Sequence, residues 1–438
     1  GSSQWAYATS SSYDIPYSCR FDDGSTHHLK RTFGSAGTTN RWSASFWFKR
    51  ANISDAYYGA YGWAGSQMNI MSVNGAGADY GEIALGSNDY LYFFEVVSGS
   101  YPMRFYKDGY RLHDPGAWMH VLIASDLSQS TEAERIRIYF NGVENTSWNV
   151  STTNNSTWAY WNAAVEHNIG TGTDHTGSKF DGYLAEMHWI DGAQLTPASF
   201  GETGDYGEWK PIEVDVTYGT NGFYLDFADS AALGNDVSGN NNDFTVVNLT
   251  AVDQMLDTPT NNFCTWNPLT KPAYTNTLSE GNLKANSSAD WSGRFGTFAV
   301  TSGKWYWEIS EGNQSDSEMS LQTGIVVEDI QQNAQTHHTL AGSIAYQANG
   351  QIRVDGSVTD TVANYDDPDD IVGVALDLDS GTNTVKFYEN NNLVATKDLT
   401  ANFTGKAVVP FAGAYQHYWM ANFGQDSSFA GAKTAQGN

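Results

Sequence analysis

Strand-like alternation in the C-terminal third of the chain constrains the fold more than any other feature of the sequence. Residues 303–309 read Gly-Lys-Trp-Tyr-Trp-Glu-Ile, which places Trp305, Trp307 and Ile309 on one face of an extended strand. Residues 370–382 read Asp-Ile-Val-Gly-Val-Ala-Leu-Asp-Leu-Asp-Ser-Gly-Thr and are apolar on both faces until the second Asp, as in a largely buried sandwich strand. The closing Asp-Ser-Gly-Thr predicts a hairpin turn whose glycine is free to take a positive φ, and Val-Lys-Phe-Tyr-Glu-Asn follows as the return strand.

This set of blocks resembles the signature of a SPRY domain, which combines a Trp-Tyr-Trp-Glu strand with a Val-Gly-Val-Ala-Leu-Asp hairpin. The later Pro410-Phe411 and the Ala-Asn-Phe-Gly at 421–424 also fit that family. The resemblance implies an antiparallel β-sandwich that is not an enzyme and binds partners through its loops. It implies that the loops at 331–338, 364–370 and 415–419 border the partner surface.

The N-terminal half carries a second set of alternating blocks. Residues 41–50 place Trp42, Phe46 and Phe48 on one face, and residues 117–125 are expected to pair with 135–143, where Asn-Gly predicts a tight turn. Together the blocks resemble a laminin-G-like, concanavalin-A-type jelly roll. The resemblance rests on the order and spacing of Phe-Asp-Asp at 21–23, Trp-Met-His-Val at 118–121, Ile-Tyr-Phe-Asn-Gly at 138–142 and Phe-Asp-Gly-Tyr-Leu-Ala-Glu at 180–186.

The composition is that of an all-β chain with many turns. Aromatic residues make up 14% of the 438 residues, glycines number 43, and lysine and arginine together only 22. The formal net charge of −27 repels phosphate backbones, so we expect no nucleic-acid binding. No run of about 18 apolar residues occurs, so we expect no membrane span.

We therefore expect an all-β fold of two antiparallel β-sandwich (jelly-roll) domains joined by a packed bridging segment. Phe223, Leu225 and Phe227 make the bridge too apolar for a free linker, so it should hold the two domains rigidly. The expected boundaries are an N-terminal extension at 1–16, the jelly roll at 17–200, the bridge at 201–275, the SPRY-like sandwich at 276–430 and a C-terminal tail at 431–438.

The whole order of segments resembles virion or fibre-associated proteins encoded by tailed phages, especially marine ones. The resemblance implies a non-enzymatic protein on the virion surface, in an extracellular setting. It would mediate attachment through a host glycan or protein and contact other virion proteins, and we expect a homo-oligomer. The first alternative is a purely structural capsid or tail decoration protein.

A polysaccharide hydrolase on the jelly roll is the second alternative. Glucanases of this fold class need carboxylates close together on one strand. The nearest candidates, Asp181 with Glu186 and Glu308 with Glu311, lack the i, i+2 spacing, and Glu213-Val-Asp215 has it without a third acid. We read Asp181 and Glu186 as structural, and we expect no catalytic residues.

No cofactor is required by any motif, and calcium is the metal that the sequence favours over a transition metal at His27-His28 or His337-His338, because adjacent strand residues point to opposite faces. Calcium prefers clustered carboxylate and carbonyl oxygens. The resemblance to jelly rolls with a rim calcium would place Asp22 or Asp23 among its ligands, while solvated acidic turns are the competing interpretation. Acidic clusters also occur at 236–243 and 366–370.

Aromatic-rich loops are the candidate glycan contacts, because an exposed ring stacks on the apolar face of a pyranose. Two stretches between core strands are the richest, although the same rings would equally serve as sandwich core or as contacts between subunits. The candidates are Tyr57, Tyr58, Tyr61 and Trp63 in the first stretch, and Trp158, Tyr160 and Trp161 in the second.

The chain has two cysteines, Cys19 and Cys264, in different expected domains. Two buried free thiols are the favoured interpretation, with a disulfide as the alternative.

Overall fold

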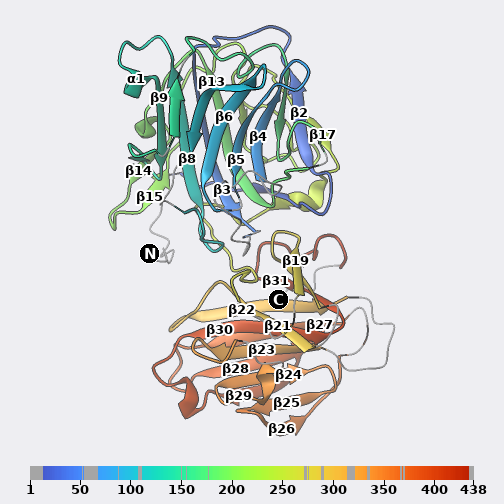
Figure 1. The fold of residues 1–438 in the computed structure, drawn as a ribbon. Helices are drawn as coiled ribbons and strands as arrows, with labels where there is room; N and C mark the ends of the chain where they lie inside the picture. The colour runs from blue at the N-terminus through green and yellow to red at the C-terminus, as the bar shows by residue number, and fades with distance from the viewer. Residues whose placement is uncertain are drawn as a thin grey trace. The chain divides into compact units, whose positions relative to one another are not determined.

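A computed structural model shows a chain built almost entirely of β-strands, which confirms the all-β prediction (Figure 1). It separates into two compact units, Gly1–Asn262 and Phe263–Asn438. The structure describes residues 13–51, 53, 68–86, 88–106, 111–148, 150–153, 155–175, 177–270, 274, 276–287, 291–312, 321–332, 336–365, 367 and 370–433.

The first unit is a sandwich of two antiparallel sheets. Sheet A contains, in spatial order, β10 (Val143–Glu144), β9 (Ile136–Phe140), β8 (Met119–Asp126), β3 (Arg41–Arg50), β13 (Gly182–Asp191), β1 (Ser18–Phe21) and β18 (Gln254–Met255), with β16 (Phe223–Leu225) also on β13. Sheet B contains β11 (Val150–Thr153), β7 (Ser100–Tyr106), β6 (Leu91–Val97), β5 (Tyr80–Leu85), β4 (Met68–Asn74), β12 (Glu166–Ile169), β2 (His28–Thr32) and β17 (Thr245–Val247). Short elements are α1 (Glu132–Arg135), η1 (Pro197–Ser199), η2 (Ala251–Asp253) and the hairpin of β14 (Gly201–Thr203) with β15 (Trp209–Pro211).

The expected pairing of 117–125 with 135–143 is confirmed, because β8 lies antiparallel to β9 with Ile123 opposite Ile138. The predicted Asn-Gly turn is present, and Asn141 and Gly142 both have positive φ, at 46° and 77°. Positive φ at both central residues is what a tight hairpin turn of this kind requires.

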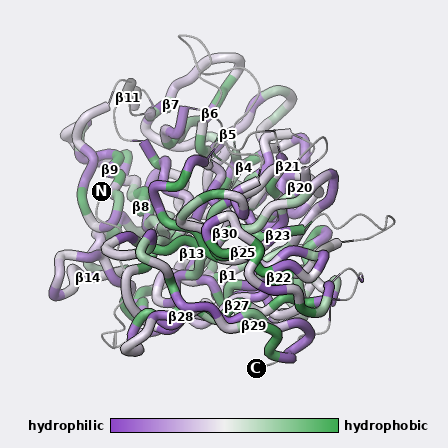
Figure 2. The backbone as a smooth tube through the Cα atoms, turned by 90° about the horizontal axis from the view of Figure 1, so that it is seen from below, coloured by the Kyte–Doolittle hydropathy of each residue, from purple (hydrophilic) through white to green (hydrophobic). Residues whose placement is uncertain are grey.

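Four tryptophans form the centre of the core between sheets A and B. Trp42 of β3 stacks on Trp189 of β13 with ring centroids 4.5 Å apart. The ring centroids of Trp158 and Trp161 lie 5.7 Å and 6.1 Å from that of Trp42. Hydrophobic and hydrophilic stretches follow one another along the backbone tube (Figure 2).

The segment after the jelly-roll strands adds strands to the same two sheets. β16 and β18 extend sheet A, and β17 extends sheet B. Two buried ion pairs fix its last part: Arg20 with Asp253 (3.3 Å), and Lys49 with Asp257 (2.7 Å). Of the expected bridge 201–275, the residues up to 262 therefore belong to the first unit, and the rest belong to the second.

The second unit is also a sandwich of two antiparallel sheets. Sheet C contains β19 (Asn276–Ser279), β20 (Lys284–Ser287), β31 (Tyr418–Asn422), β22 (Lys304–Glu311), β27 (Ile371–Asp377), β28 (Thr384–Glu389) and β29 (Asn392–Asp398). Sheet D contains β21 (Trp291–Phe295), β30 (Val408–Tyr415), β23 (Leu321–Val327), β24 (Ser343–Gln347), β25 (Gln351–Val354) and β26 (Ser357–Thr361), and the short turns are η3 (His337–Thr339) and η4 (Ala401–Phe403).

The predicted hairpin of this unit is confirmed, because β27 pairs with β28 and also with β22. Its turn differs from the expectation: Gly381 does not take a positive φ. The side chain of Asp377 closes the turn instead, because its Oδ1 accepts hydrogen bonds from the backbone N–H groups of Asp379 and Ser380, both at 3.0 Å. Trp307 is in the core as predicted, whereas Trp305, on the same face at the start of β22, is 38% exposed.

Within the described residues, no helix is long and apolar enough to cross a membrane.

Candidate functional site

The sequence-predicted glycan contacts fall into three groups in the structure. Tyr57, Tyr58, Tyr61 and Trp63 lie outside the described residues. Trp158 and Trp161 are 2% and 0% exposed in the core, so they offer no ring face to a sugar, and the expectation for these two is corrected. Tyr160 is half-buried and donates a hydrogen bond to Asp79 Oδ2 (2.8 Å).

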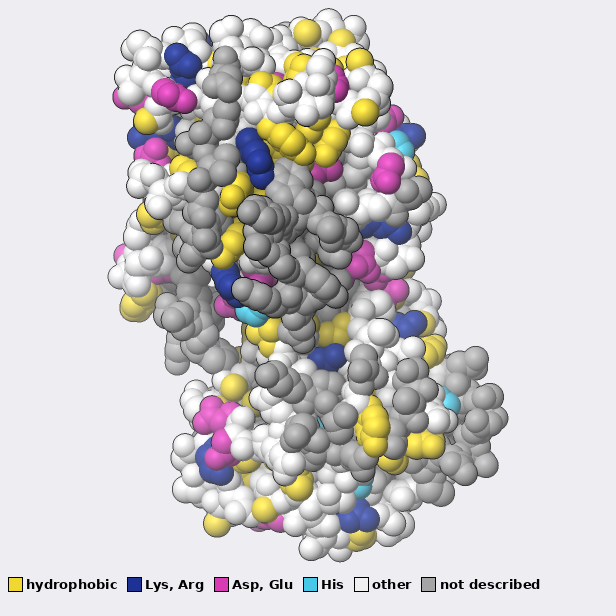
Figure 3. Space-filling model, viewed as in Figure 1, with side chains coloured by type: hydrophobic (Ala, Val, Ile, Leu, Met, Phe, Trp, Pro, Cys, Tyr) yellow, Lys and Arg dark blue, Asp and Glu magenta, His cyan; other side chains and the backbone are white. Residues whose placement is uncertain are grey.

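A cluster of aromatic side chains covers the outer face of sheet B, on strands β5 to β7. Tyr92, Phe94 and Val96 of β6 form its buried floor. Half-buried tyrosines pack against that floor, and Figure 3 shows side chains of the hydrophobic class, which includes tyrosine, over these strands. We call the set the aromatic face, and its half-buried members are Tyr80, Tyr90, Tyr101 and Tyr106.

Close ring contacts hold the aromatic face in place. Tyr92 stacks on Tyr106 with centroids 5.4 Å apart, and Phe94 meets Tyr101 edge-on at 5.7 Å. The guanidinium of Arg104 lies 5.2 Å from the ring centroids of both Tyr101 and Tyr106, within cation–π distance. The arrangement presents rigid ring surfaces with a positive charge beside them.

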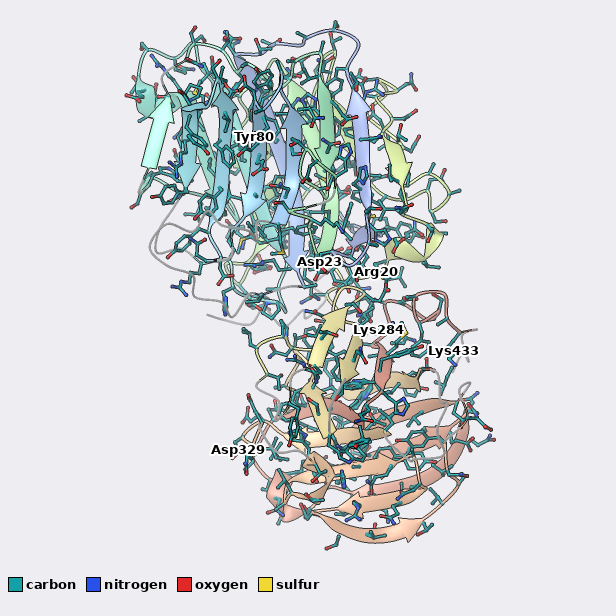
Figure 4. All side chains as sticks on the ribbon, turned by 45° about the vertical axis from the view of Figure 1, so that its right-hand side comes forward. Arg20, Asp23, Tyr80, Lys284, Asp329 and Lys433 are labelled. Carbon is teal, nitrogen blue, oxygen red and sulfur yellow. The ribbon has the colours of Figure 1, made fainter. Side chains whose placement is uncertain are left out.

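A group of oxygen atoms borders the aromatic face. Glu82 of β5 lies opposite Phe94 in the pairing of β5 with β6, and Tyr80 is two residues away on the same strand (Figure 4). Asn69 Nδ2 donates to Glu82 Oε1 (3.1 Å), and burial raises the pKa of Glu82 to about 7, with the charge of Asp174 adding to the rise. We call Asn69, Glu82 and Asp174 the oxygen cluster.

One neutral oxygen of this cluster has unused hydrogen-bonding capacity. Asn69 is 0% exposed, and its Oδ1 has no partner in the part of the chain that the structure describes. An unsatisfied buried acceptor costs about 1–3 kcal/mol, so such an atom in a native protein calls for a water or an ion. Carboxylate and amide oxygens are the ligand types that a hard cation such as Ca²⁺ prefers.

The sequence-predicted metal ligands show no comparable features. Asp22 is 7% exposed and its Oδ1 accepts a hydrogen bond from the N–H of Gly24 (2.8 Å), which is the geometry of an Asx turn, while Asp23 is exposed. In the acidic stretch 236–243, Asp236 accepts four hydrogen bonds from backbone and hydroxyl donors, so its oxygens are already committed. No group of three or more His, Cys, Asp or Glu side chains is arranged around a common metal position among the residues described.

One serine–histidine contact has the composition of a catalytic dyad but the wrong proton arrangement. His120 Nε2 lies 2.8 Å from Ser45 Oγ, and Trp209 Nε1 donates to His120 Nδ1 (3.1 Å). An indole N–H can only donate, so Nδ1 carries no proton and Nε2–H must donate to the serine oxygen. His120 therefore cannot accept the serine proton, and burial lowers its pKa to about 3.

The two carboxylates weighed for a hydrolase have different places in the first unit. Asp181 directly precedes β13, and Glu186 lies inside it at a β-bulge, with a φ of 50°. Glu186 is held by tyrosine hydroxyls: Tyr224 donates to Oε1 (2.7 Å) and Tyr13 donates to Oε2 (3.0 Å).

Both cysteines are buried free thiols, which confirms the favoured interpretation. Burial raises the pKa of Cys19 well above its ordinary value, so this thiol is unreactive at neutral pH.

Comparison with known protein families identifies both domains. Residues 23–199 match the model described as the Concanavalin A-like lectin/glucanases superfamily, and residues 304–426 match the SPRY domain. The chain therefore carries a laminin-G-like, concanavalin A-like domain followed by a SPRY domain, and both are folds of binding modules. No curated protein matches the chain.

Solved structures of low sequence identity are similar to parts of the chain. The SPRY domain of human HERC1 is 15% identical with a TM-score of 0.31, and the match covers 36% of this chain and 98% of that domain. A heptameric SAP-like pentraxin from Limulus polyphemus is 16% identical with a TM-score of 0.29, and the match covers 42% of this chain and 80% of that one.

From the sequence, we looked for glycan contacts in loops and did not predict the aromatic face, which lies on strands, although the sequence contains a signal for it. Tyrosine and phenylalanine recur at every second position from Tyr90 to Phe94, and Arg104 and Tyr106 follow the same period on the next strand. The inward positions, such as Phe93, are aromatic too, so periodicity alone did not reveal which rings faced outward.

Proposed function

We propose that this chain is a non-enzymatic binding protein that holds carbohydrate on the outer face of sheet B. One observation carries the proposal: half-buried tyrosine rings on a buried aromatic floor lie beside the oxygen cluster. Rings of this kind stack on the apolar faces of sugars, while carboxylate and amide groups bond their hydroxyls.

Calcium at the oxygen cluster is part of this proposal. The ion would neutralise the repulsion between Glu82 and Asp174 and satisfy Asn69 Oδ1. Calcium accepts six to eight oxygen ligands, so it would retain free positions for waters or sugar hydroxyls. The charge of Glu82 also helps to raise the pKa of Tyr80, which shows that the two groups interact electrostatically.

The virion surface is the setting that we propose, with host glycan as the ligand and a homo-oligomeric assembly. The resemblance in segment order supports this setting, and the formal charge of −27 favours solubility in salty surroundings. In the competing proposal of a decoration protein, the aromatic face would be buried against a neighbouring subunit, and the isolated protein would bind no glycan reproducibly.

A glycan array with the full chain tests the binding proposal. Tyr80→Ala should reduce the signal at least tenfold, since loss of one stacking ring costs more than about 1.4 kcal/mol at a central contact. Tyr206→Ala is the matched control, because Tyr206 is 82% exposed on a different hairpin and should leave binding unchanged. An array on which the parent protein binds nothing contradicts the proposal and favours the decoration protein.

Terbium luminescence tests the cation separately. Tb³⁺ bound at the oxygen cluster should be sensitised by excitation of the nearby Tyr80, and Ca²⁺ should displace it. Asp174→Asn should abolish the signal, while Asp23→Asn should preserve it. The reverse pattern would move the ion to the rim position that the sequence suggested.

A further inference from the structure

Two adjacent histidines of the second unit pack against the outer face of sheet D. His337 and His338, in the turn η3, are 0% and 6% exposed. The ring of His337 packs edge-on against Phe295 of β21 (4.9 Å) and Phe411 of β30 (6.0 Å). The ring of His338 approaches Trp291 of β21 (6.0 Å), so one turn reaches several strands.

The sheet is shaped to receive these rings. Gly293, Gly413, Gln322 and Gln347 lie opposite one another in successive strands and form one row across the sheet. A Cβ atom at Gly293 would come within 3.0 Å of His337 Nδ1, so the absence of a side chain there makes room for the imidazole.

A directional hydrogen-bond chain fixes the protonation state of His338. Arg353 Nε donates to Gln347 Oε1 (2.7 Å), so the amide nitrogen of Gln347 faces His338 Nε2 (3.2 Å) and must donate to it. Nδ1 of His338 then carries the proton and donates to Gln322 Oε1. Arginine does not lose its proton in proteins, so the chain of donors cannot reverse.

We propose that residues 336–340 form a pH-operated cover on sheet D, which is closed by neutral His338 and released when that ring is protonated. A proton on Nε2 would place two donors, the ring N–H and the Gln347 amide, against each other. It would also add a positive charge beside Arg353 of β25.

Among the described residues, the surroundings of the turn offer the protonated ring no negative charge. The described groups that face it are Gln322 of β23, Gln347 of β24 and Trp291 of β21, which are uncharged, and Arg353 and His337, which would repel a charged ring. Within the described residues, no carboxylate contributes to the pKa of His338, and burial together with Arg353 lowers that pKa to about 4. Burial lowers the pKa of His337 as well.

The sign of the response follows from linkage. A histidine released from the cover has an ordinary pKa of about 6.5, so the open form takes up a proton more readily than the closed form. The closed form is favoured above pH 6.5 and loses its advantage as the pH falls. With pKa values of about 6.5 open and 4 closed, the opening equilibrium should rise roughly 60-fold between pH 7.0 and pH 4.5.

Hydrogen exchange of the full chain at pH 7.0 and pH 4.5, corrected for intrinsic rates, tests the proposal. Amides of residues 337–342 should lose protection by roughly 60-fold at pH 4.5, while amides of β27 in the same unit should not. His338→Gln should remain protected at both pH values, because a glutamine amide can replace both hydrogen bonds of the neutral ring. His417→Gln, a histidine of the same unit outside the turn, should open as the parent does.

Arg353→Gln provides an independent variant if the first is poorly folded. It removes the fixed donor, so the Gln347 amide can turn its oxygen toward a protonated His338, and the response to acid should shrink. The proposal is overturned if the turn keeps its protection at pH 4.5 in the parent, or if His338→Gln opens as the parent does.

Discussion

Removing the charge of Lys49 should destabilise the first unit more than any surface substitution. Lys49 and Asp257 both have 0% exposed side chains and their charged atoms are 2.7 Å apart. Lys49 Nζ also donates to Asn262 Oδ1 (2.8 Å), and Trp118 Nε1 donates to Asp257 Oδ1 (2.9 Å). The pair therefore ties the last residues of the unit to the centre of sheet A.

The magnitude follows from the desolvation of an unpaired ion. Lys49→Met leaves the carboxylate of Asp257 buried without its cation, which costs about 3–5 kcal/mol. Because a domain of this kind is stable by only about 5–15 kcal/mol, this loss is a large fraction of the total. Lys49→Met combined with Asp257→Asn removes both charges and keeps an acceptor for Trp118, so the double variant should be more stable than Lys49→Met alone.

Native-state hydrogen exchange of amides in β3 and β13 would measure the free energy of unfolding of this unit within the full chain. Lys210→Met is the matched control, because Lys210 pairs with Glu202 at 3.6 Å with side chains 25% and 56% exposed. An exposed pair contributes about 0–1 kcal/mol. A loss below 1 kcal/mol for Lys49→Met, or a double variant less stable than the single, would refute the argument from desolvation.

Three further predictions concern the first unit. Burial raises the pKa of Glu95 from 4.5 to about 7, so the unfolded chain loses this proton at a lower pH than the folded chain does. The free energy of unfolding should therefore fall by about 3 kcal/mol as the pH rises from 4.5 to 7. In Glu95→Gln, the free energy of unfolding should change less over that pH range. Trp161→Ala should cost about 3–5 kcal/mol in denaturant unfolding, whereas Tyr206→Ala should change stability by less than about 0.5 kcal/mol. Gly182→Ala should lower the melting temperature, because Gly182 has a φ of 145° and a Cβ there would lie 2.2 Å from the carbonyl oxygen of Lys49.

The strands were predictable because period-two alternation is a local property of the chain. The tight turn at Asn141-Gly142 was also local, since only two residues determine its backbone. The hairpin turn of the second unit was predicted in place but not in mechanism, because the side chain of Asp377 replaced the expected glycine conformation. Local patterns thus identify elements more reliably than the interactions that close them.

The candidate site was harder to predict because it depends on pairings between distant segments. Trp158 and Tyr160 belong to one aromatic-rich stretch, yet the first is buried and the second half-buried, and their sequence context does not distinguish them. In the oxygen cluster, Asn69 and Glu82 of two strands meet, and the charge of Asp174, in a loop some ninety residues later, acts on Glu82. The spacing of these residues in the sequence does not predict that they interact in the folded chain.

Histidines illustrate the same limit at the level of a single proton. Trp209 sets the tautomer of His120 from 89 residues away, and Arg353 sets that of His338 through an intervening amide. In both cases a group that can only donate forces the neighbouring ring nitrogen to accept, so the imidazole is held neutral. Because His120 must donate to Ser45 in that state, the contact that most resembles a catalytic dyad cannot work as one. Chemistry at these rings is therefore decided by their donors, which only the folded chain brings to them.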